Sequence, residues 1–275
     1  MNRSEAVLLG ITVIWGTTFP VMKVSLEYIP PILFLAYRFG IASALMLLLF
    51  RGRVLQRETL LEGFLLGLTL FFGNGLQIIG LKYTTASNSA FITSLYVVFT
   101  PFIAYYVLGS RVKGRDFAAL SIALLGLYLI SGTSMNFGYG DLLTSLCAVS
   151  FAFQIVLVEK FRGEDYLSLA FWQIFWNFIL ALAYASVKEG FYVPKAAIAW
   201  GGIIYTGVFA TVLTFTLQTK FQRYTKAHRA ALIYSAEPIF GYISSFIALG
   251  EVLSPAGYLG ALLILAAIWY ELRGS

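Results

Sequence analysis

The sequence predicts an all-α polytopic membrane protein with ten transmembrane helices, arranged as two inverted five-helix repeats. Three observations predict this fold: the composition, the spacing of apolar segments, and an internal match between 82–109 and 223–250. Of the 275 residues, 59% are hydrophobic and only 12% are charged, and the mean hydropathy is +0.82. An ordinary soluble domain carries about 25% charged residues, so this composition excludes a soluble protein.

Ten apolar runs of roughly membrane-spanning length follow one another along the chain. They cover residues 6–22, 32–50, 63–81, 88–108, 117–131, 141–158, 167–187, 197–218, 230–249 and 256–271. Ten spans of about 20 residues use about 200 residues, which leaves no room for a catalytic domain outside the membrane. The first run has no small-residue cleavage site and leads directly into further spans, so we expect a retained helix there.

The breaks between the runs justify the division element by element. In chain order they are 23–31, 51–62, 82–87, 109–116, 132–140, 159–166, 188–196, 219–229 and 250–255. Each contains charged residues, glycine or proline, such as Pro30-Pro31 in the first break and three arginines in the second. Charged side chains are costly at bilayer depth, so we expect these segments to be loops.

Basic residues are distributed unequally between the two sides of such a bundle. The side that holds the N-terminus carries fourteen: Arg3, Arg51, Arg53, Arg57, Arg111, Lys113, Arg115, Lys160, Arg162, Lys220, Arg223, Lys226, Arg229 and Arg273. The other side carries four, Lys23, Lys82, Lys188 and Lys195, while Arg38 falls inside the second span. Basic loops are retained in the cytoplasm, so both termini are expected there. The net charge of +6 therefore reflects topology, and no nucleic-acid partner is expected.

The internal match joins the fourth and ninth spans. Sliding the sequence along itself until 82–109 lies on 223–250 gives nine identities in 28 positions, more than shared apolar composition readily supplies. This repeat shift advances the chain by five spans, and five is odd, so the two copies have opposite orientations in the membrane. Inverted repeats are typical of carriers that work by alternating access around a midplane site. We therefore expect repeats at 1–135 and 136–275 that form one transport domain.

Several short motifs resemble those of a known family. The first span carries Trp15-Gly16-Thr17-Thr18-Phe19-Pro20, the second carries Arg38-Phe39, and the ninth carries Glu237-Pro238 before Leu249-Gly250-Glu251. Together with the repeated five-helix unit, they resemble the EamA-type transporters of the drug/metabolite transporter (DMT) superfamily over nearly the whole chain. The first half departs from the pattern, since Tyr96-Val97 stands where Glu237-Pro238 stands in the second half.

The resemblance implies a multi-pass carrier in the cell inner (plasma) membrane that moves small organic solutes, commonly by export of amino acids or related metabolites. Fold-level similarity does not choose a ligand. Efflux of lipophilic cations, attracted by an acid and by aromatic faces, is the alternative. Small-molecule substrate and lipid bilayer are the expected partners, with proton coupling a further expectation; the sequence does not indicate an oligomeric state.

Two charged residues lie deep within spans, where polar groups usually face the bundle interior or a water-filled cavity. Arg38 must reach the headgroups, bond to helix-end carbonyls, find an acid or face an anion such as a substrate carboxylate. Glu237 is a candidate for proton coupling or gating, although its position before Pro238 also allows it to satisfy a local break in the helix.

Other candidate substrate-binding residues are expected near the midplane. They are Trp15, Thr18, Asn74, Gln77, Tyr96 and Gln154, with Trp176 and Asn177 as an aromatic and amide wall. Because the run that holds them begins near the cytoplasmic end of the seventh span, the ordinary interfacial belt is the favoured interpretation of that wall. Pro20, Pro101 and Pro238 are candidate hinges, since each removes a backbone hydrogen bond.

An intramembrane enzyme is a distant alternative, because it would need a nucleophile, paired acids or metal ligands at membrane depth. The single histidine, His228, has no acidic partner nearby in sequence, and the single cysteine is Cys147. These counts exclude zinc-like His/Cys spacing and a disulfide framework. No catalytic residue, metal or cofactor is therefore expected.

Overall fold

Helices are the regular elements in all parts of the computed structural model that are described, namely residues 2–111, 113–131, 138–250, 252 and 254–273. The first half contains α1 (Arg3–Ser25), α2 (Pro31–Phe50), the 3-10 turns η1 (Arg51–Val54) and η2 (Arg57–Thr59), α3 (Leu60–Tyr83), α4 (Ala86–Thr93), α5 (Tyr96–Leu108) and α6 (Gly114–Ser131). Among the described helical segments, nine are long and apolar enough to cross a membrane, and α6 accompanies them as the predicted fifth span. The predicted all-α polytopic fold is confirmed.

The second half repeats this order. It contains α7 (Tyr139–Lys160), α8 (Tyr166–Lys188), α9 (Ala197–Gly207), the π-helical turn η3 (Val208–Leu213), α10 (Thr214–Gln222), α11 (Ala227–Tyr234), α12 (Glu237–Leu249) and α13 (Pro255–Leu272). Three predicted spans are therefore interrupted: the fourth is α4 with α5, the eighth is α9 to α10, and the ninth is α11 with α12.

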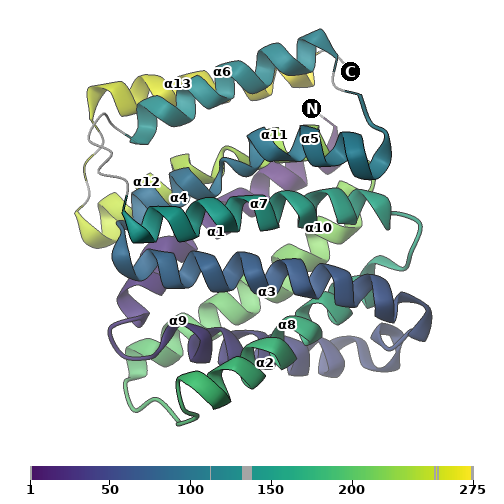
Figure 1. The fold of residues 1–275 in the computed structure, drawn as a ribbon, viewed down its shortest axis with the longest axis vertical. Helices are drawn as coiled ribbons and strands as arrows, with labels where there is room; N and C mark the ends of the chain where they lie inside the picture. Colours follow the sequence, from purple (N-terminus) through teal and green to yellow (C-terminus); the bar gives the residue numbers. More distant parts are fainter. Residues whose placement is uncertain (1, 112, 132–137, 251, 253, 274–275) are drawn as a thin grey trace.

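The helices pack as layers of one bundle. Figure 1 shows α6 and α13 side by side along one edge, and α2, α8 and α9 at the opposite edge. Between them, α3 packs along α7, and α1 packs along α12. Figure 1 also shows both ends of the chain on the same side of the bundle, as an even number of crossings requires. We call this the terminal side.

The interrupted helices α4–α5 and α11–α12 are built alike. Each breaks after a serine, Ser94 or Ser235, whose backbone N–H still contacts carbonyls of the preceding helix. Each ends at a glycine, Gly109 or Gly250, with a φ of 65° or 69°. Glycine adopts this left-handed conformation without the steric cost of a Cβ, and it ends helices for that reason. The break and the cap thus both recur at the repeat shift defined by the sequence match.

Of the three candidate hinge prolines, only Pro238 lies next to one of these breaks. Pro238 stands in the first turn of α12, where a missing N–H costs nothing. Pro101 lies inside α5 and Pro20 inside α1, and both helices continue through them. Glu251, which belongs to one of the family motifs, falls outside the described residues.

One close helix contact positions the middle of the bundle. A Cβ built on Gly16 of α1 would lie 2.6 Å from the Cβ of Phe240 and 2.7 Å from the backbone nitrogen of Gly241, both in α12. Only glycine permits this approach. It brings the Trp15 and Thr18 region of α1 against the start of α12, where Glu237 stands.

Candidate functional site

A cavity of about 60 Å³ lies at the middle of the bundle. Each half of the chain contributes seven of the lining residues: Trp15, Thr18, Arg38, Asn74, Gln77, Thr93 and Tyr96 from the first, and Phe151, Gln154, Ile155, Phe215, Gln218, Tyr234 and Glu237 from the second. Small-molecule sites usually combine apolar walls with a few polar groups. This cavity has that composition, and its volume is smaller than the roughly 300–1,000 Å³ of typical ligand sites.

Four pairs of lining residues are related by the repeat shift. They are Asn74 with Phe215, Gln77 with Gln218, Thr93 with Tyr234, and Tyr96 with Glu237. The last pair is in direct contact, because the Tyr96 hydroxyl donates to Glu237 Oε2 at 3.2 Å. Equivalent positions of two inverted repeats meet only near the axis that relates the repeats. The cavity therefore lies on that axis, as in other carriers built from inverted repeats.

Arg38 lies on one wall of the cavity and is only 3% exposed. Its Nε donates to Thr211 Oγ1 at 2.8 Å, and its Nη2 donates to the carbonyl of Ala210 at 3.1 Å. Both acceptors belong to η3, where the π-helical turn interrupts the α-helical hydrogen-bond pattern. Nη1 contacts only the sulfur of Met22, at 3.7 Å, a weak acceptor.

The charge of Arg38 has hydrogen-bond acceptors but no counter-ion. The ion pairs found within the described ranges all lie elsewhere, around His228 and Arg229. Glu237, 6% exposed, also lines the cavity and has no cation within ion-pair distance among the same residues. Two buried charges of opposite sign therefore face one cavity without being paired. Such charges are costly unless a ligand, water or proton compensates them.

Aromatic side chains and amides complete the walls. The Trp15 ring meets Tyr234 edge-on with centroids 5.3 Å apart, and its Nε1 donates to Thr214 Oγ1 at 3.0 Å. Four glutamines form a network: Gln154 bonds Gln173 and Gln218, and Gln218 Nε2 donates to Gln222 at 3.1 Å. The Tyr234 hydroxyl joins the same network through Gln222 Oε1. These bonds fix the orientation of the amides that face the cavity.

The residues singled out from the sequence divide into two groups. Trp15, Thr18, Arg38, Asn74, Gln77, Tyr96, Gln154 and Glu237 all line the cavity. Trp176 does not, because its ring packs edge-on against Phe64, with centroids 5.2 Å apart, beside Gly67 of α3. Asn177 is buried outside the cavity lining, and neither of its side-chain polar atoms has a hydrogen-bond partner among the residues that the structure describes.

Sequence reasoning missed Phe151, Ile155, Phe215, Gln218 and Tyr234. A signal for three of them was present in the repeat, since Phe215, Gln218 and Tyr234 are the repeat counterparts of Asn74, Gln77 and Thr93. Phe151 and Ile155 flank Gln154 on α7 and have no comparable polar signal. Pro20 and Pro101 lie within helices next to this region but are not among the lining residues.

Comparison with known proteins agrees with this architecture. The sequence model of the EamA-like transporter family matches residues 3–132 and again 138–271. An "Uncharacterized transporter" of Archaeoglobus fulgidus is 37% identical over 94% of this chain and 82% of its own length. A "Probable amino-acid metabolite efflux pump" of Salmonella typhimurium is 25% identical over 100% of this chain and 96% of its own.

One solved crystal structure has the same fold. It superposes with a TM-score of 0.79, covers 99% of this chain and 98% of its own, and is 20% identical in sequence. At that identity the likeness concerns the fold alone. The two matches to the family model together span nearly the whole chain, and they coincide with the two sets of helices described above. The chain therefore belongs to the EamA-like transporter family.

Proposed function

We propose that the protein exports a small zwitterionic solute, an amino acid or a related amphipathic metabolite, by alternating access around the central cavity. The observation that carries this proposal is the pair of buried, mutually unpaired charges, Arg38 and Glu237, on one cavity. A zwitterion offers a carboxylate to the first and an ammonium to the second. Relatives named as amino-acid metabolite efflux pumps support this choice of substrate class.

The contacts in this proposal follow from the polar atoms that the two charged side chains leave for a ligand. The substrate carboxylate binds Arg38 through Nη1, whose present contact is a thioether sulfur. The ammonium binds Glu237 beside the Tyr96 hydroxyl, and the apolar body lies against Trp15 and Phe215. Hydrogen bonds between charged groups are roughly twice as strong as neutral ones, so these two contacts set the orientation of the ligand.

The inverted repeats supply the conformational change. Two similar halves of opposite orientation can exchange conformations, and the bundle then opens alternately to each side of the membrane. The proposed moving parts are the breaks after Ser94 and Ser235, with Pro20, Pro101 and Pro238 as hinges. Glu237 is the proposed coupling residue, because a proton and the substrate ammonium compete for the same carboxylate. Both termini are placed in the cytoplasm on the distribution of basic residues.

Efflux of lipophilic cations is the second candidate function. It is favoured by one observation, that Glu237 and the aromatic rings of Trp15 and Tyr234 line the same cavity. A cation is attracted by both an acid and aromatic faces. A buried arginine would repel a cationic substrate, so this function does not explain the presence of Arg38 in the cavity. Arg38 therefore distinguishes the two proposals.

The test is counterflow in proteoliposomes with three matched solutes: an amino acid, the amine that lacks its carboxylate, and a lipophilic cationic dye. We expect saturable uptake of the amino acid and little uptake of the amine or dye. A thermal-shift panel identifies which amino acid to use, because a ligand at about 100 times its Kd stabilises by about 2.7 kcal/mol. Uptake of dye and amine without uptake of any amino acid would overturn the proposal in favour of the second function.

A further inference from the structure

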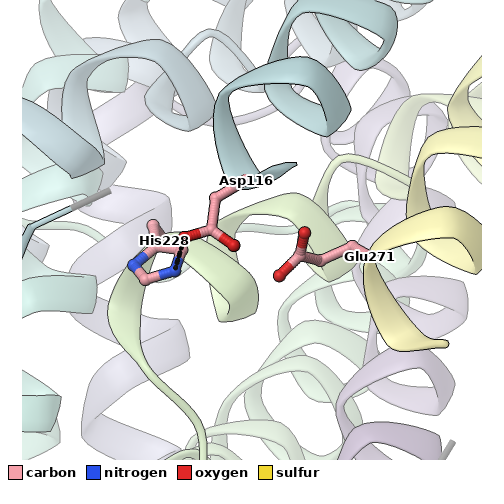
Figure 2. Close-up of side chains that lie close together, drawn as sticks. All are labelled: Asp116, His228 and Glu271. Carbon is pink, nitrogen blue, oxygen red and sulfur yellow. Dashed lines mark ion pairs between the residues drawn. The ribbon is translucent and has the colours of Figure 1, made fainter. Parts of the chain in front are cut away.

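A second cluster of ionisable side chains lies on the terminal side, apart from the cavity. Figure 2 shows its three members: Asp116 from the first turn of α6, His228 from the first turn of α11, and Glu271 from the last turn of α13. His228 Nε2 lies 3.4 Å from Asp116 Oδ2. One ligand atom from each residue lies within 4.8 Å of the other two. The structure thus provides His228 with acidic partners that its sequence neighbours do not offer.

Glu271 is the most informative member. Its side chain is buried, with Oε1 3.0 Å from Arg229 Nε, while Oε2 is shielded from solvent and, among the described residues, has no hydrogen-bond partner other than a proton shared with Asp116. Figure 2 shows this carboxylate facing Asp116 and His228. A buried carboxylate oxygen without a partner is costly, and a second carboxylate beside it adds repulsion. The arrangement calls for either a shared proton or a cation between the two acids.

We propose that Asp116, His228 and Glu271 bind a divalent transition-metal ion, for which Zn²⁺ is the natural probe. The ligand types fit, since imidazole nitrogen and carboxylate oxygen are common Zn²⁺ ligands at about 2.0–2.2 Å. Tetrahedral ligands at that distance lie about 3.3–3.6 Å from one another. The 3.4 Å between His228 Nε2 and Asp116 Oδ2 matches this spacing. A small inward movement of Glu271 completes three ligands and leaves a fourth position for water.

The surroundings of the cluster suit an added cation. Two carboxylates lie at ion-pair distance from Arg229: Glu271 Oε1 is 3.0 Å from its Nε, and Glu5 Oε1 is 3.9 Å from its Nη2. Arg115 is otherwise engaged, because its guanidinium stacks on the Tyr270 ring, 4.6 Å from the centroid. Arg229 holds Glu271 Oε1 and so directs Oε2 into the cluster, which is the usual role of a partner behind a metal ligand. Lys226, two residues before His228 in the chain, also acts electrostatically on the imidazole.

The proposed ion would join the two repeats. Asp116 belongs to the first repeat, whereas His228 and Glu271 belong to the second. Helix α11 continues through the break at Ser235 into α12, which begins with Glu237 of the cavity. An ion that ties α6 to α11 and α13 on the terminal side would therefore resist relative movement of the repeats. We expect bound Zn²⁺ to slow transport from a site that does not contact the substrate.

The experiment measures Zn²⁺ binding to the purified, metal-free full chain, independently of transport. Calorimetric titration should give one Zn²⁺ per chain, and Zn²⁺ should raise the melting temperature. His228→Gln, Asp116→Asn and Glu271→Gln should each weaken binding by at least about 10-fold. Two controls should bind as the wild type does: Glu58→Gln, an exposed carboxylate in η2, and Cys147→Ser, which removes the only thiol.

Co²⁺ provides a second readout. Its visible absorption bands report nitrogen and oxygen ligation directly, and the bands should be lost in His228→Gln. Each variant is first shown to be monodisperse, so that a variant that fails to fold is replaced by another of the three. A wild type that binds no Zn²⁺ would overturn the proposal and indicate that the two acids share a proton instead. Undiminished Zn²⁺ binding by both single variants, His228→Gln and Glu271→Gln, would also overturn it. Zn²⁺ binding with failed amino-acid transport would contradict only the proposed function.

Discussion

Arg38→Gln is expected to weaken binding of a zwitterionic substrate by about 100-fold. In the wild type, Nε and Nη2 of Arg38 are occupied by Thr211 and Ala210, and Nη1 remains for the ligand. A hydrogen bond to a charged group contributes about 1.5–3 kcal/mol. At about 1.4 kcal/mol per tenfold, that range corresponds to roughly 10- to 150-fold in Kd. The upper half of this range in Kd applies because the cavity is largely shielded from water.

Thr211→Val is the matched control for this prediction. It removes the hydroxyl that accepts from Arg38 Nε and donates to the Thr206 carbonyl, yet it keeps the guanidinium charge and its bond to Ala210. Calorimetric Kd values for an amino acid and its decarboxylated amine should therefore change little in Thr211→Val. Arg38→Gln should lose affinity for the amino acid and not for the amine. Wild-type affinity in Arg38→Gln would refute the reasoning and leave Arg38 as an anchor for η3 alone.

Three other predictions address coupling, packing and movement. Glu237→Gln should abolish the dependence of proteoliposome uptake on a pH gradient and weaken binding of the zwitterion, since the amide keeps the shape but neither exchanges a proton nor pairs with the substrate ammonium; unchanged coupling would exclude Glu237 as the coupling residue. Gly16→Ala should lower the free energy of unfolding by about 1–3 kcal/mol through its clash with Phe240 and Gly241, whereas Gly10→Ala, with open space around it, should be neutral or slightly stabilising in the same denaturation assay. Pro101→Ala should alter turnover and leave the melting temperature near that of the wild type; unaltered turnover would show a static kink.

The membrane spans could be predicted because their signal is local. Hydropathy alone located each apolar run to within several residues of the helices observed. The break after Ser94 was not predicted, because the proline of this span, Pro101, lies within α5 rather than at the break. A local break beside Ser235 was one of the interpretations of Glu237-Pro238. Backbone geometry at these points follows from packing between helices, which composition does not encode.

The candidate site was predictable to the extent that its polar groups lie inside spans. Arg38 and Glu237 stood out for that reason, whereas Gln218 and Tyr234, the repeat counterparts of Gln77 and Thr93, were missed although the repeat shift contained a signal for them. No sequence signal predicts the turn η3, since Val208–Leu213 contains neither glycine nor proline. The cluster of Asp116, His228 and Glu271 was hidden as well, because its members lie at the ends of three different helices far apart in sequence. Tertiary contact creates both features.

The two repeats share a backbone plan but differ in chemistry, and the differences concentrate on the second repeat. Position 96 is a tyrosine where its counterpart, position 237, is a glutamate, and α3 is continuous where its counterpart is interrupted by η3. Arg38 belongs to the first repeat, yet its hydrogen bonds to Ala210 and Thr211 tie its guanidinium to the second. If those hydrogen bonds hold while the halves rock against each other, both charges that face the cavity stay with the second repeat. Under the proposed mechanism, the substrate travels with that half, and its two charged contacts persist in both access states while the apolar contacts from α1 change.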